Sequence, residues 1–404
     1  MKTKPNPSTT GRAGTYVRQP GGFVAFVPAS LPPAPAISFD GLVPLLSRAD
    51  QAVGRLDGEI RNLPNPEFFV AMYVRREAVF SSQIEGTQST LEDLLVVELE
   101  PRIRDFSKDV DEIVNYVAAM NYGLERLATL PLSLRLIREI HRELLRGVRG
   151  ENRLPGEFRR GQNYIAPAGA RRIEDATFIP PPVPEMRRAL DDLERFLHEP
   201  GDLPALVHAG IAHAQFETIH PFMDRNGRVG RLLITFLLVH NGILHRPLLY
   251  LSLYLKRHRL EYYDRLMAIR DEGDWEGWLR FFVRGVAATA EEATLKARAI
   301  VRLIEDQRAE IQERGLSPNA FRLLDLLYQR PFVHVNLVSE ALGVSFSTAN
   351  GLIDQFQTLR LVEEITGRKR DRVFRFGPYL RHFEEEEGPI SPGQPIQETE
   401  QAPA

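Results

Sequence analysis

The sequence contains no cysteine, which excludes disulfide bonds, thiol chemistry and cysteine-ligated zinc. It has no uninterrupted apolar run long enough to span a bilayer, so no membrane segment is expected. Residues 1–7 lead into serine, threonine and glycine instead of the apolar segment of a signal peptide. We therefore expect a cytoplasmic protein. The formal net charge of −3 argues against a protein that coats nucleic acid.

The remaining composition is ordinary for a globular protein. The 404 residues, of which 43% are hydrophobic and 26% charged, suffice for two or three domains with separate cores. Apolar residues recur at helical spacing along most of the chain, which predicts a mainly α-helical fold. The predicted helical segments are 39–97, 110–127, 132–145, 183–197, 204–219, 275–296 and 297–314. Residues up to about 20 are predicted to be disordered, and 21–35 to form an extended arm.

The densest group of chemically active residues is the segment 220–231, His-Pro-Phe-Met-Asp-Arg-Asn-Gly-Arg-Val-Gly-Arg. It lies between the predicted helix 204–219 and an apolar helical segment, 232–240, which Asn241-Gly242 would end. The loop thus opens a buried helix, and the unpaired N–H groups of a helix N-terminus favour bound anions. Gly227 lets the backbone approach a ligand closely.

Four side chains of this segment suit chemistry on phosphates. Arg228 and Arg231 are three residues apart, share one helix face and can clamp the same polyphosphate. Asp224 can hold Mg²⁺ against those phosphates, and His220 titrates near neutrality, which suits proton abstraction from a hydroxyl. The alternative is a plain helix corner with a capping aspartate and solvated arginines, although arginines near a helix N-terminus oppose the helix dipole.

The segment resembles the Fic motif, His-x-Phe-x-(Asp/Glu)-Gly-Asn-Gly-Arg-x-x-Arg, at every fixed position except Arg225, where the family usually has glycine. The resemblance covers roughly residues 39–286 and implies adenylylation, the transfer of AMP from ATP to a Ser, Thr or Tyr hydroxyl. It implies that His220 is the base and that Asp224 holds Mg²⁺ on the α- and β-phosphates. The implied ATP site consists of Arg225, Asn226, Gly227, Arg228, Val229, Gly230, Arg231, Tyr262 and Tyr263.

Within that site the resemblance implies that Asn226, Gly227 and Arg228 form the anion hole and that Arg231 reaches the γ-phosphate. The two tyrosines of the helical segment 261–266 would border the adenine, although aromatic residues at this spacing are more often core residues. Arg225 would disturb the local geometry if its position requires a positive φ.

Two histidines of the preceding helix, His208 and His213, are five residues apart and are interpreted as packing residues. The chain lacks the three-ligand pattern of a zinc site.

A second motif lies upstream, where Ser81, Glu85 and Gly86 follow the amphipathic helical run 66–80. Gly86 would end that helix, and residues 89–92 read as a capping box that begins the next one. This stretch resembles the Fic inhibitory motif, (Ser/Thr)-x-x-x-Glu-(Gly/Asn). The resemblance implies that Glu85 pairs with Arg231 and occupies the space of the γ-phosphate. The alternative for Glu85 is an ordinary surface or capping carboxylate.

Short apolar pieces at 158–165 and 177–182, separated by a Pro/Gly-containing turn in 166–170, predict a β-hairpin. In the Fic family a flap hairpin at this place receives the target segment by strand addition, a known recognition mode. The resemblance places Ile165 near the target side chain. A plain surface hairpin is the alternative.

The C-terminal region has the pattern of a winged helix-turn-helix domain, with helices at 319–328, 335–342 and 347–361 and a hairpin at 362–376. Residues 316–381 contain nine Arg/Lys and six Asp/Glu, a net charge of +3. The basic hairpin segment 368–370 is the best candidate for a phosphate contact. Binding of DNA, docking of a protein target and formation of a homodimer all remain open.

The sequence therefore predicts a mainly α-helical Fic core with a β-hairpin flap and a C-terminal winged helix. The predicted regions are an N-terminal arm (1–38), a helical region with the inhibitory motif (39–130), the catalytic core (131–290), a linker helix (291–315), the winged helix (316–383) and a disordered acidic tail (384–404).

We expect a protein adenylyltransferase that uses ATP and Mg²⁺, is inhibited by Glu85, and modifies a hydroxyl of another protein or of itself. One alternative is that the same site removes AMP. Another is a DNA-binding regulator that only senses a nucleotide.

Overall fold

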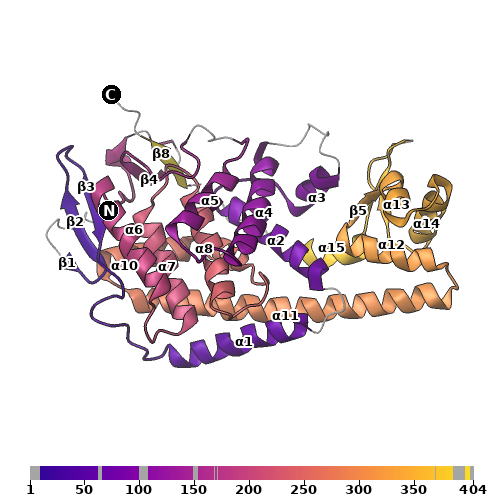
Figure 1. The fold of residues 1–404 in the computed structure, drawn as a ribbon, viewed down its shortest axis with the longest axis horizontal. Helices are drawn as coiled ribbons and strands as arrows, with labels where there is room; N and C mark the ends of the chain where they lie inside the picture. Colours follow the sequence, from indigo (N-terminus) through magenta and orange to yellow (C-terminus); the bar gives the residue numbers. More distant parts are fainter. Residues whose placement is uncertain are drawn as a thin grey trace.

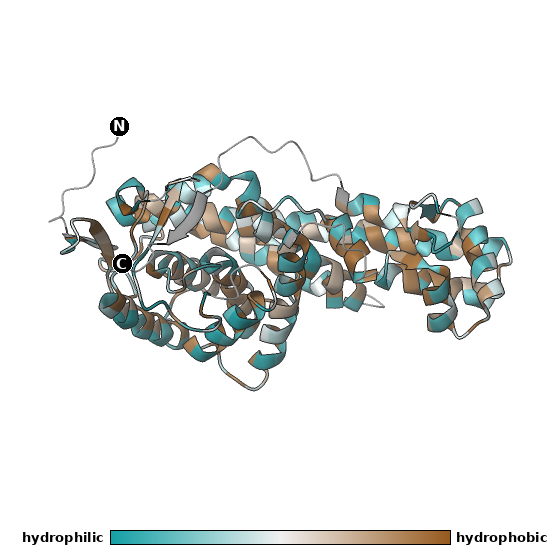
Figure 2. Ribbon diagram, turned by 90° about the horizontal axis from the view of Figure 1, so that it is seen from above, coloured by the Kyte–Doolittle hydropathy of each residue, from teal (hydrophilic) through white to brown (hydrophobic). Residues whose placement is uncertain are grey.

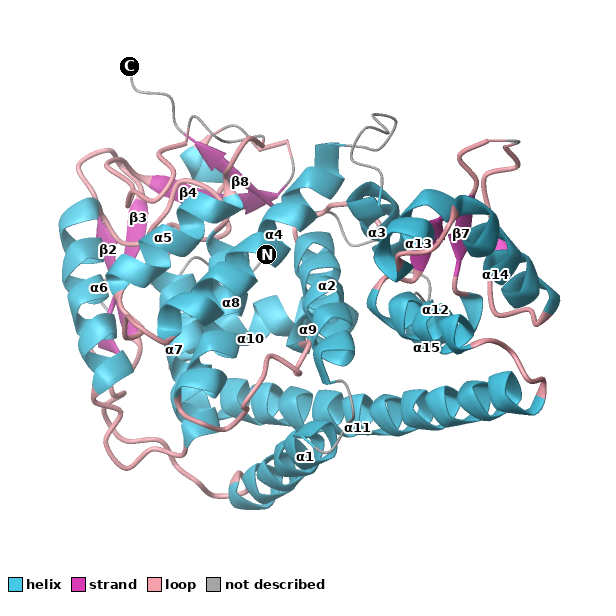
Figure 3. Cartoon of the chain, turned by 45° about the vertical axis from the view of Figure 1, so that its right-hand side comes forward, coloured by secondary structure: helices cyan, strands magenta, loops and turns pink. Residues whose placement is uncertain are grey.

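The computed structural model describes residues 10–61, 66–99, 108–148, 153–167, 169–170, 172–368, 370–384 and 396–400. The fold is mainly helical, as predicted, with three small antiparallel sheets (Figures 1 and 3). The helices are α1 (Val43–Arg61), α2 (Pro66–Ile84), α3 (Leu91–Leu99), α4 (Lys108–Leu127), α5 (Leu134–Leu144), α6 (Val183–His198), α7 (Ala205–Ile219), α8 (Asn226–His240), α9 (Leu251–Arg257), α10 (Arg259–Glu272), α11 (Trp275–Glu313), α12 (Pro318–Gln329), α13 (Val335–Leu342), α14 (Phe346–Thr358) and α15 (Gly377–Glu384). The strands are β1 (Thr10–Gly11), β2 (Gly14–Arg18), β3 (Val24–Pro28), β4 (Asn163–Pro167), β5 (Phe332–His334), β6 (Glu363–Glu364), β7 (Val373–Arg375) and β8 (Ile396–Glu400).

Two adjacent helices, α7 and α8, form the centre of the larger helical body (Figure 1). Every residue of α7 except its first is buried, because neighbouring helices cover it on all sides. Helices α2, α4, α5, α6, α10 and α11 pack around this pair. The loop between α7 and α8 carries residues 220–225 of the motif, and residues 226–231 form the first turns of α8. The motif is thus held by two buried helices.

The long helix α11 joins the two ends of the molecule, and α1 packs along it (Figures 1 and 3). Its 39 residues correspond to a length of about 58 Å at the α-helical rise. The sequence predicted two consecutive helical pieces here, 275–296 and 297–314, and the structure shows one continuous helix. The hydropathy colouring in Figure 2 shows hydrophobic and hydrophilic residues alternating along the helices, as expected of amphipathic elements.

The N-terminal region differs from the prediction of disorder up to about residue 20. Strands β1, β2 and β3 form a sheet in that order, and β2 pairs with β3 from Gly14↔Pro28 to Arg18↔Val24. Side chains fix this sheet to the helical body, since Arg12 pairs with Glu276 at 2.7 Å. Such long-range contacts order a segment whose composition alone favours disorder.

The predicted hairpin is present in a reduced form. Strand β4 pairs at one edge with a single residue, because the backbone N–H groups of Ile165 and Phe178 donate to each other's carbonyl oxygens. A short 3₁₀ helix, Ile173–Asp175, replaces a regular turn. Strand β8 pairs antiparallel with β4, with Ile165 opposite Glu398. The acidic tail, 384–404, was expected to be disordered, whereas its residues 396–400 form strand β8.

The C-terminal module follows the predicted order of helices and hairpin. Its elements run α12, β5, α13, α14, β6, β7 and α15, and the sheet order is β5-β7-β6. Helix α14 ends at Thr358, three residues before the predicted end at Leu361. Among the helices that the structure describes, none is long and apolar enough to cross a membrane.

Candidate active site

The loop of residues 220–225 contains two residues in the left-handed backbone conformation, which few residue types adopt easily. His220 ends α7 in the left-handed region, with φ 49° and ψ 60°. Its carbonyl oxygen accepts hydrogen bonds from Arg159 Nε and Asn163 Nδ2, both at 3.1 Å. Asn163 Nδ2 also donates to the Phe222 carbonyl oxygen at 2.9 Å. Two side chains from the flap region thus fix the conformation at His220.

Asn226 closes the loop from the other side. Its Oδ1 accepts the backbone N–H of Phe222 and its Nδ2 donates to the carbonyl oxygen of the same residue, each at 2.8 Å. The buried amide therefore ties the start of α8 to the loop. An asparagine at this motif position has a structural role here, whatever else it binds.

Arg225, the one departure from the motif, has φ 63° and ψ 15°. This left-handed conformation suits glycine, since residues with a Cβ are strained there by about 1–3 kcal/mol. The position thus has the positive φ at which an arginine would disturb the local geometry. The Arg225 guanidinium turns away from the loop toward α4, where it pairs with Glu112.

The imidazole of His220 is buried, and its pKa is lowered to about 4. Burial is the largest cause, the charges of Arg270 and Arg159 act in the same direction, and Glu217 opposes the shift. His220 is consequently neutral at pH 7, which is the protonation state that a general base needs.

Asp224 lies on the more open side of the loop, with its side chain 27% exposed. Its Oδ1 accepts the backbone N–H of Arg225 at 2.8 Å. The Asp224 carbonyl oxygen lies 3.2 Å from Nε2 of His141, whose ring stacks on Phe222 at 3.8 Å. Because Gly156 donates its N–H to His141 Nδ1, the ring proton is on Nε2 and points at Asp224. His141 thereby steadies the loop next to Asp224.

Glu85 lies directly over the N-terminus of α8. A Cβ added at Gly227 would come 2.3 Å from Glu85 Oε1, so the carboxylate occupies the space that the glycine leaves. Arg231 Nη2 donates to the same oxygen at 2.6 Å. The burial of Glu85 alone would raise its pKa, but Arg231, Arg228 and Arg259 lower it below the ordinary value. An ionised carboxylate therefore lies at the N-terminus of α8.

Arg231 makes its other contacts with Ser81, one turn before Glu85 on α2. Arg231 Nε donates to Ser81 Oγ at 2.8 Å, and Nη2 donates to the Ser81 carbonyl oxygen at 3.0 Å. Gly86 has φ 101° and ends the helix. The inhibitory pattern predicted from the sequence thus has the ion pair that the resemblance implies.

Arg228 is also buried, but it has a different partner. Its Nη2 donates to Glu112 on α4 at 2.8 Å. Its Nε and Nη1 are buried and have no hydrogen-bond partner among the residues that the structure describes. These donors leave capacity for an anion.

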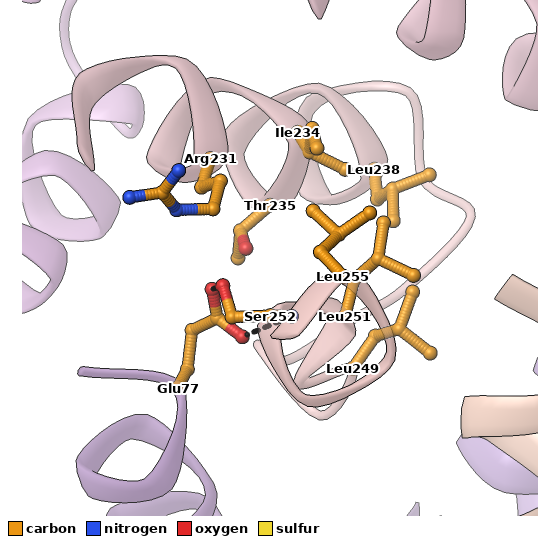
Figure 4. Close-up of a pocket in the computed structure, with 9 residues that line it drawn as sticks. All are labelled: Glu77, Arg231, Ile234, Thr235, Leu238, Leu249, Leu251, Ser252 and Leu255. Atoms are coloured by element: carbon orange, nitrogen blue, oxygen red, sulfur yellow. Dashed lines mark hydrogen bonds between the residues drawn. The ribbon is translucent and has the colours of Figure 1, made fainter. Parts of the chain in front are cut away.

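Beneath Arg231 is a cavity of about 10 Å³, room for about one water molecule (Figure 4). On its far side Glu77 accepts the Ser252 backbone N–H at 3.1 Å and the Tyr116 hydroxyl at 3.3 Å. Burial raises the pKa of Glu77. The cavity is too small for a nucleotide.

The remaining predicted site residues are buried or half-buried. Tyr262 is 1% exposed and its hydroxyl lies 2.9 Å from His213 Nε2, so its ring takes a core position. Tyr263 is half-buried, and the Arg259 guanidinium lies 5.4 Å from the centre of its ring. Ile165 is half-buried on β4.

Val229 and Gly230 are buried in the first turns of α8. The Gly230 carbonyl oxygen lies 2.9 Å from His213 Nδ1, and His208 Nε2 lies 3.1 Å from the Phe196 carbonyl oxygen. These contacts are those of packing residues, as expected for both histidines.

Sequence reasoning did not find Glu112, Asn163, Arg159 and His141. They lie on α4, the flap region and α5, far from the motif in the chain. None stands in a recognisable local pattern. The one available signal was Arg225 itself, because a buried cation at a glycine position requires a carboxylate partner somewhere.

Comparison with known proteins identifies the family. Residues 43–125 match the Fic/DOC family N-terminal domain, and residues 131–238 match the Fic/DOC family. Residues 43–238 of this chain therefore belong to the Fic/DOC family, and the resemblance drawn from the motif is confirmed.

Among curated relatives, the protein adenylyltransferase Fic of Drosophila melanogaster is 29% identical over 247 residues, 60% of this chain and 44% of the relative. The protein of the same name from Aedes aegypti is 33% identical over 213 residues, 52% of this chain and 38% of the relative. The match thus spans less than half of either relative. A crystal structure of a Fic family protein from Desulfovibrio desulfuricans G20 covers 85% of this chain and 97% of its own length, with a TM-score of 0.54 at 19% identity, which shows a shared fold.

Proposed function

We propose that this protein is an adenylyltransferase that transfers AMP from ATP to a protein hydroxyl and that Glu85 inhibits it. The observation that carries the proposal is the ion pair of Glu85 with Arg231 above Gly227. An anion already occupies the N-terminus of α8, between buried arginines, as a phosphate would. The names of the curated relatives support the same activity.

In the proposed reaction, the neutral His220 imidazole takes the proton of the target hydroxyl. The hydroxyl oxygen attacks the α-phosphorus of ATP, the bond from that phosphorus to the bridging oxygen breaks, and diphosphate leaves. Arg228 and Arg231 bind the phosphates and stabilise the charge on the leaving diphosphate. Most of the rate enhancement comes from positioning and charge neutralisation, since the protein forms no covalent intermediate in this scheme.

Asp224 is the residue that would hold Mg²⁺. In the part of the chain that the structure describes, no cluster of three or more acidic or histidine side chains can hold a metal by itself. One carboxylate together with phosphate oxygens is, however, a donor set that Mg²⁺ commonly uses. The partly exposed carboxylate of Asp224 fits that requirement. The metal ion would neutralise phosphate charge during transfer.

The test is label transfer from α-labelled ATP with Mg²⁺, with cell lysate as a source of targets. Wild type, Glu85→Gly and Glu85→Gly/His220→Ala are compared. We expect label in Glu85→Gly, much less in wild type and none in the double variant. Absence of label from all three would contradict the proposal.

Removal of AMP is the second candidate function. The lowered pKa of Glu85 keeps this carboxylate ionised at neutral pH, so it can align a water molecule and accept its proton. His220 would then have to deliver a proton to the leaving hydroxyl. Glu85→Gly would abolish release of AMP from a modified protein in this case, whereas it would raise transfer in the first.

For residues 316–383 we retain the interpretation as a winged helix, supported by the order of helices and strands. The hollow between α14 and the hairpin is lined by His334, Asn350, Arg370 and Arg372 among others. Both DNA and protein partners suit such a surface. Binding of labelled DNA by the full chain at several salt concentrations distinguishes them, because phosphate contacts weaken steeply with salt.

A further inference from the structure

Glu112 connects the unusual arginine of the motif with an arginine of the anion site. It lies on α4, is 7% exposed, and accepts hydrogen bonds from Arg225 Nη1 at 2.9 Å and Nη2 at 2.5 Å. The same carboxylate accepts Arg228 Nη2 at 2.8 Å. One buried anion thus serves two guanidinium groups.

The backbone of Arg225 is strained, because it has the left-handed conformation. Glycine would adopt φ 63° without strain, and an arginine there must be offset by favourable contacts. The bidentate contact with Glu112 is the strong, planar kind that orients a carboxylate. Arg225 therefore fixes the rotamer of Glu112, and Glu112 in turn fixes Arg228.

The hydrogen bond from Arg228 to Glu112 leaves the other donor atoms of Arg228 available to an anion. Only Nη2 is held by Glu112, while Nε and Nη1 are buried without a hydrogen-bond partner in the described part of the chain. The balance of charges at the site also favours an anion. Arg225, Arg228 and Arg231 carry three positive charges against the two negative charges of Glu112 and Glu85, and withdrawal of Glu85 leaves a net charge of +2 for a polyphosphate.

We propose that Glu112 is a positioning residue for nucleotide binding, which holds Arg228 toward the phosphates through an ion pair that it shares with Arg225. The inference rests on the proposed function, because it assigns Arg228 to the phosphates of ATP. It adds a residue that lies outside both motifs, on helix α4.

A competing role for Glu112 predicts the opposite change in the affinity for ATP. If Glu112 competed with phosphate for Arg228, as Glu85 does for Arg231, its removal would tighten ATP binding. If Glu112 positions Arg228, its removal leaves the guanidinium free to turn away, and ATP binding weakens although a negative charge is lost.

The experiment measures binding without turnover, in the full chain carrying Glu85→Gly and His220→Ala. Calorimetry gives the Kd of Mg-ATP and of adenosine, which has no phosphate, for this parent and after adding Glu112→Gln, Arg228→Ala or both. We expect Glu112→Gln to weaken ATP about tenfold and to leave adenosine within about twofold. In the presence of Arg228→Ala, Glu112→Gln should change the ATP Kd by less than about twofold.

Glu112→Asp is the second variant, since it keeps the negative charge that pairs with Arg225 and Arg228. It shortens the side chain by one methylene and cannot reach both guanidinium groups in the same geometry. We expect it to weaken ATP binding about threefold. Unchanged or tighter ATP binding in both variants, or equal losses for ATP and adenosine, would overturn the positioning role. A parent that binds adenosine but not ATP would instead contradict the proposed function itself.

Discussion

At the scale of single residues, the site depends on groups whose charge state is set by burial. His220 is neutral because burial lowers its pKa to about 4, while Glu85 is ionised because the neighbouring arginines outweigh its burial. The proposed base is therefore neutral and the proposed inhibitory carboxylate is negatively charged, as the proposed transfer and inhibition require. Two positions with positive φ, His220 and Arg225, shape the loop between them.

The pKa of His220 gives a direct prediction. The imidazole is expected to remain neutral down to about pH 4, well below the ordinary value of 6.5. NMR titration of histidine-labelled protein, with His220→Ala to assign the resonance, measures this midpoint. Because the unfolded chain protonates this residue near 6.5, its contribution to stability is present above that pH and is lost as the pH falls toward 4. A midpoint near 6.5 would show that His220 is not buried as the structure has it.

Arg231→Ala is expected to weaken both ATP use and inhibition. The guanidinium pairs with Glu85 and donates to Ser81, and it is the group assigned to the phosphate. A charge-assisted hydrogen bond contributes about 1.5–3 kcal/mol, so transfer in the Glu85→Gly background should fall about tenfold or more. Label transfer with and without Glu85 measures both effects. Retained inhibition in the chain that still carries Glu85 would contradict the role of this ion pair.

At the scale of elements, the flap strand β4 has two edges with different neighbours. Ile165 pairs with Phe178 on one edge, and β8 covers the other. A strand with an open edge readily accepts another segment, and β8 pairs with the edge of β4 that would otherwise be open.

Removal of residues 385–404 is expected to uncover that edge. Backbone amides of β4 that face β8 should exchange with solvent faster, while the Ile165 amide, which donates to Phe178, should remain protected. Hydrogen exchange of the full and the shortened chain measures this. A second variant is Gln397→Pro, which removes one backbone N–H from β8 and should also speed the exchange of the β4 amides that face β8. Unchanged exchange in the shortened chain would mean that β8 does not cover β4 in solution.

At the scale of the whole molecule, the C-terminal module packs against α2, the helix that ends directly before Glu85. Arg76 of α2 is 1% exposed, and its guanidinium lies 4.5 Å from the ring centre of Tyr250 and 5.3 Å from that of Phe383. Phe383 belongs to α15 at the end of the module. Figure 1 shows α15 at the end of the module that faces α2, next to α11. The module therefore steadies α2 far from the catalytic loop.

Phe383→Ala is expected to destabilise the chain by about 3 kcal/mol, the usual loss for a buried phenylalanine. It should also raise label transfer in the chain that retains Glu85, because α2 loses a fixed contact. Phe346→Ala is the matched control, since that ring is 58% exposed at the start of α14 and should change stability by less than about 0.5 kcal/mol. Denaturant unfolding and label transfer are the two measurements. Equal effects of the two substitutions would remove the link between the module and α2.

The sequence by itself determined the features that depend on neighbours along the chain. Helical periodicity predicted α7 and α2, and these two predictions are confirmed because hydrogen bonds and side-chain spacing within a helix are local. The compact motifs around His220 and Glu85 predicted an anion site and its inhibitor, and these roles stay predictions.

Only the tertiary structure decided which distant residues meet. Arg231 meets Glu85 across 146 positions, and Arg225 meets Glu112 across 113, in a contact that no local pattern announces. The N-terminal sheet and β8 form against composition that favours disorder, since their strands are completed by pairing with other segments. Pairing of this kind is chosen by the packing of the whole chain, and a strand pairs only where a partner edge is available.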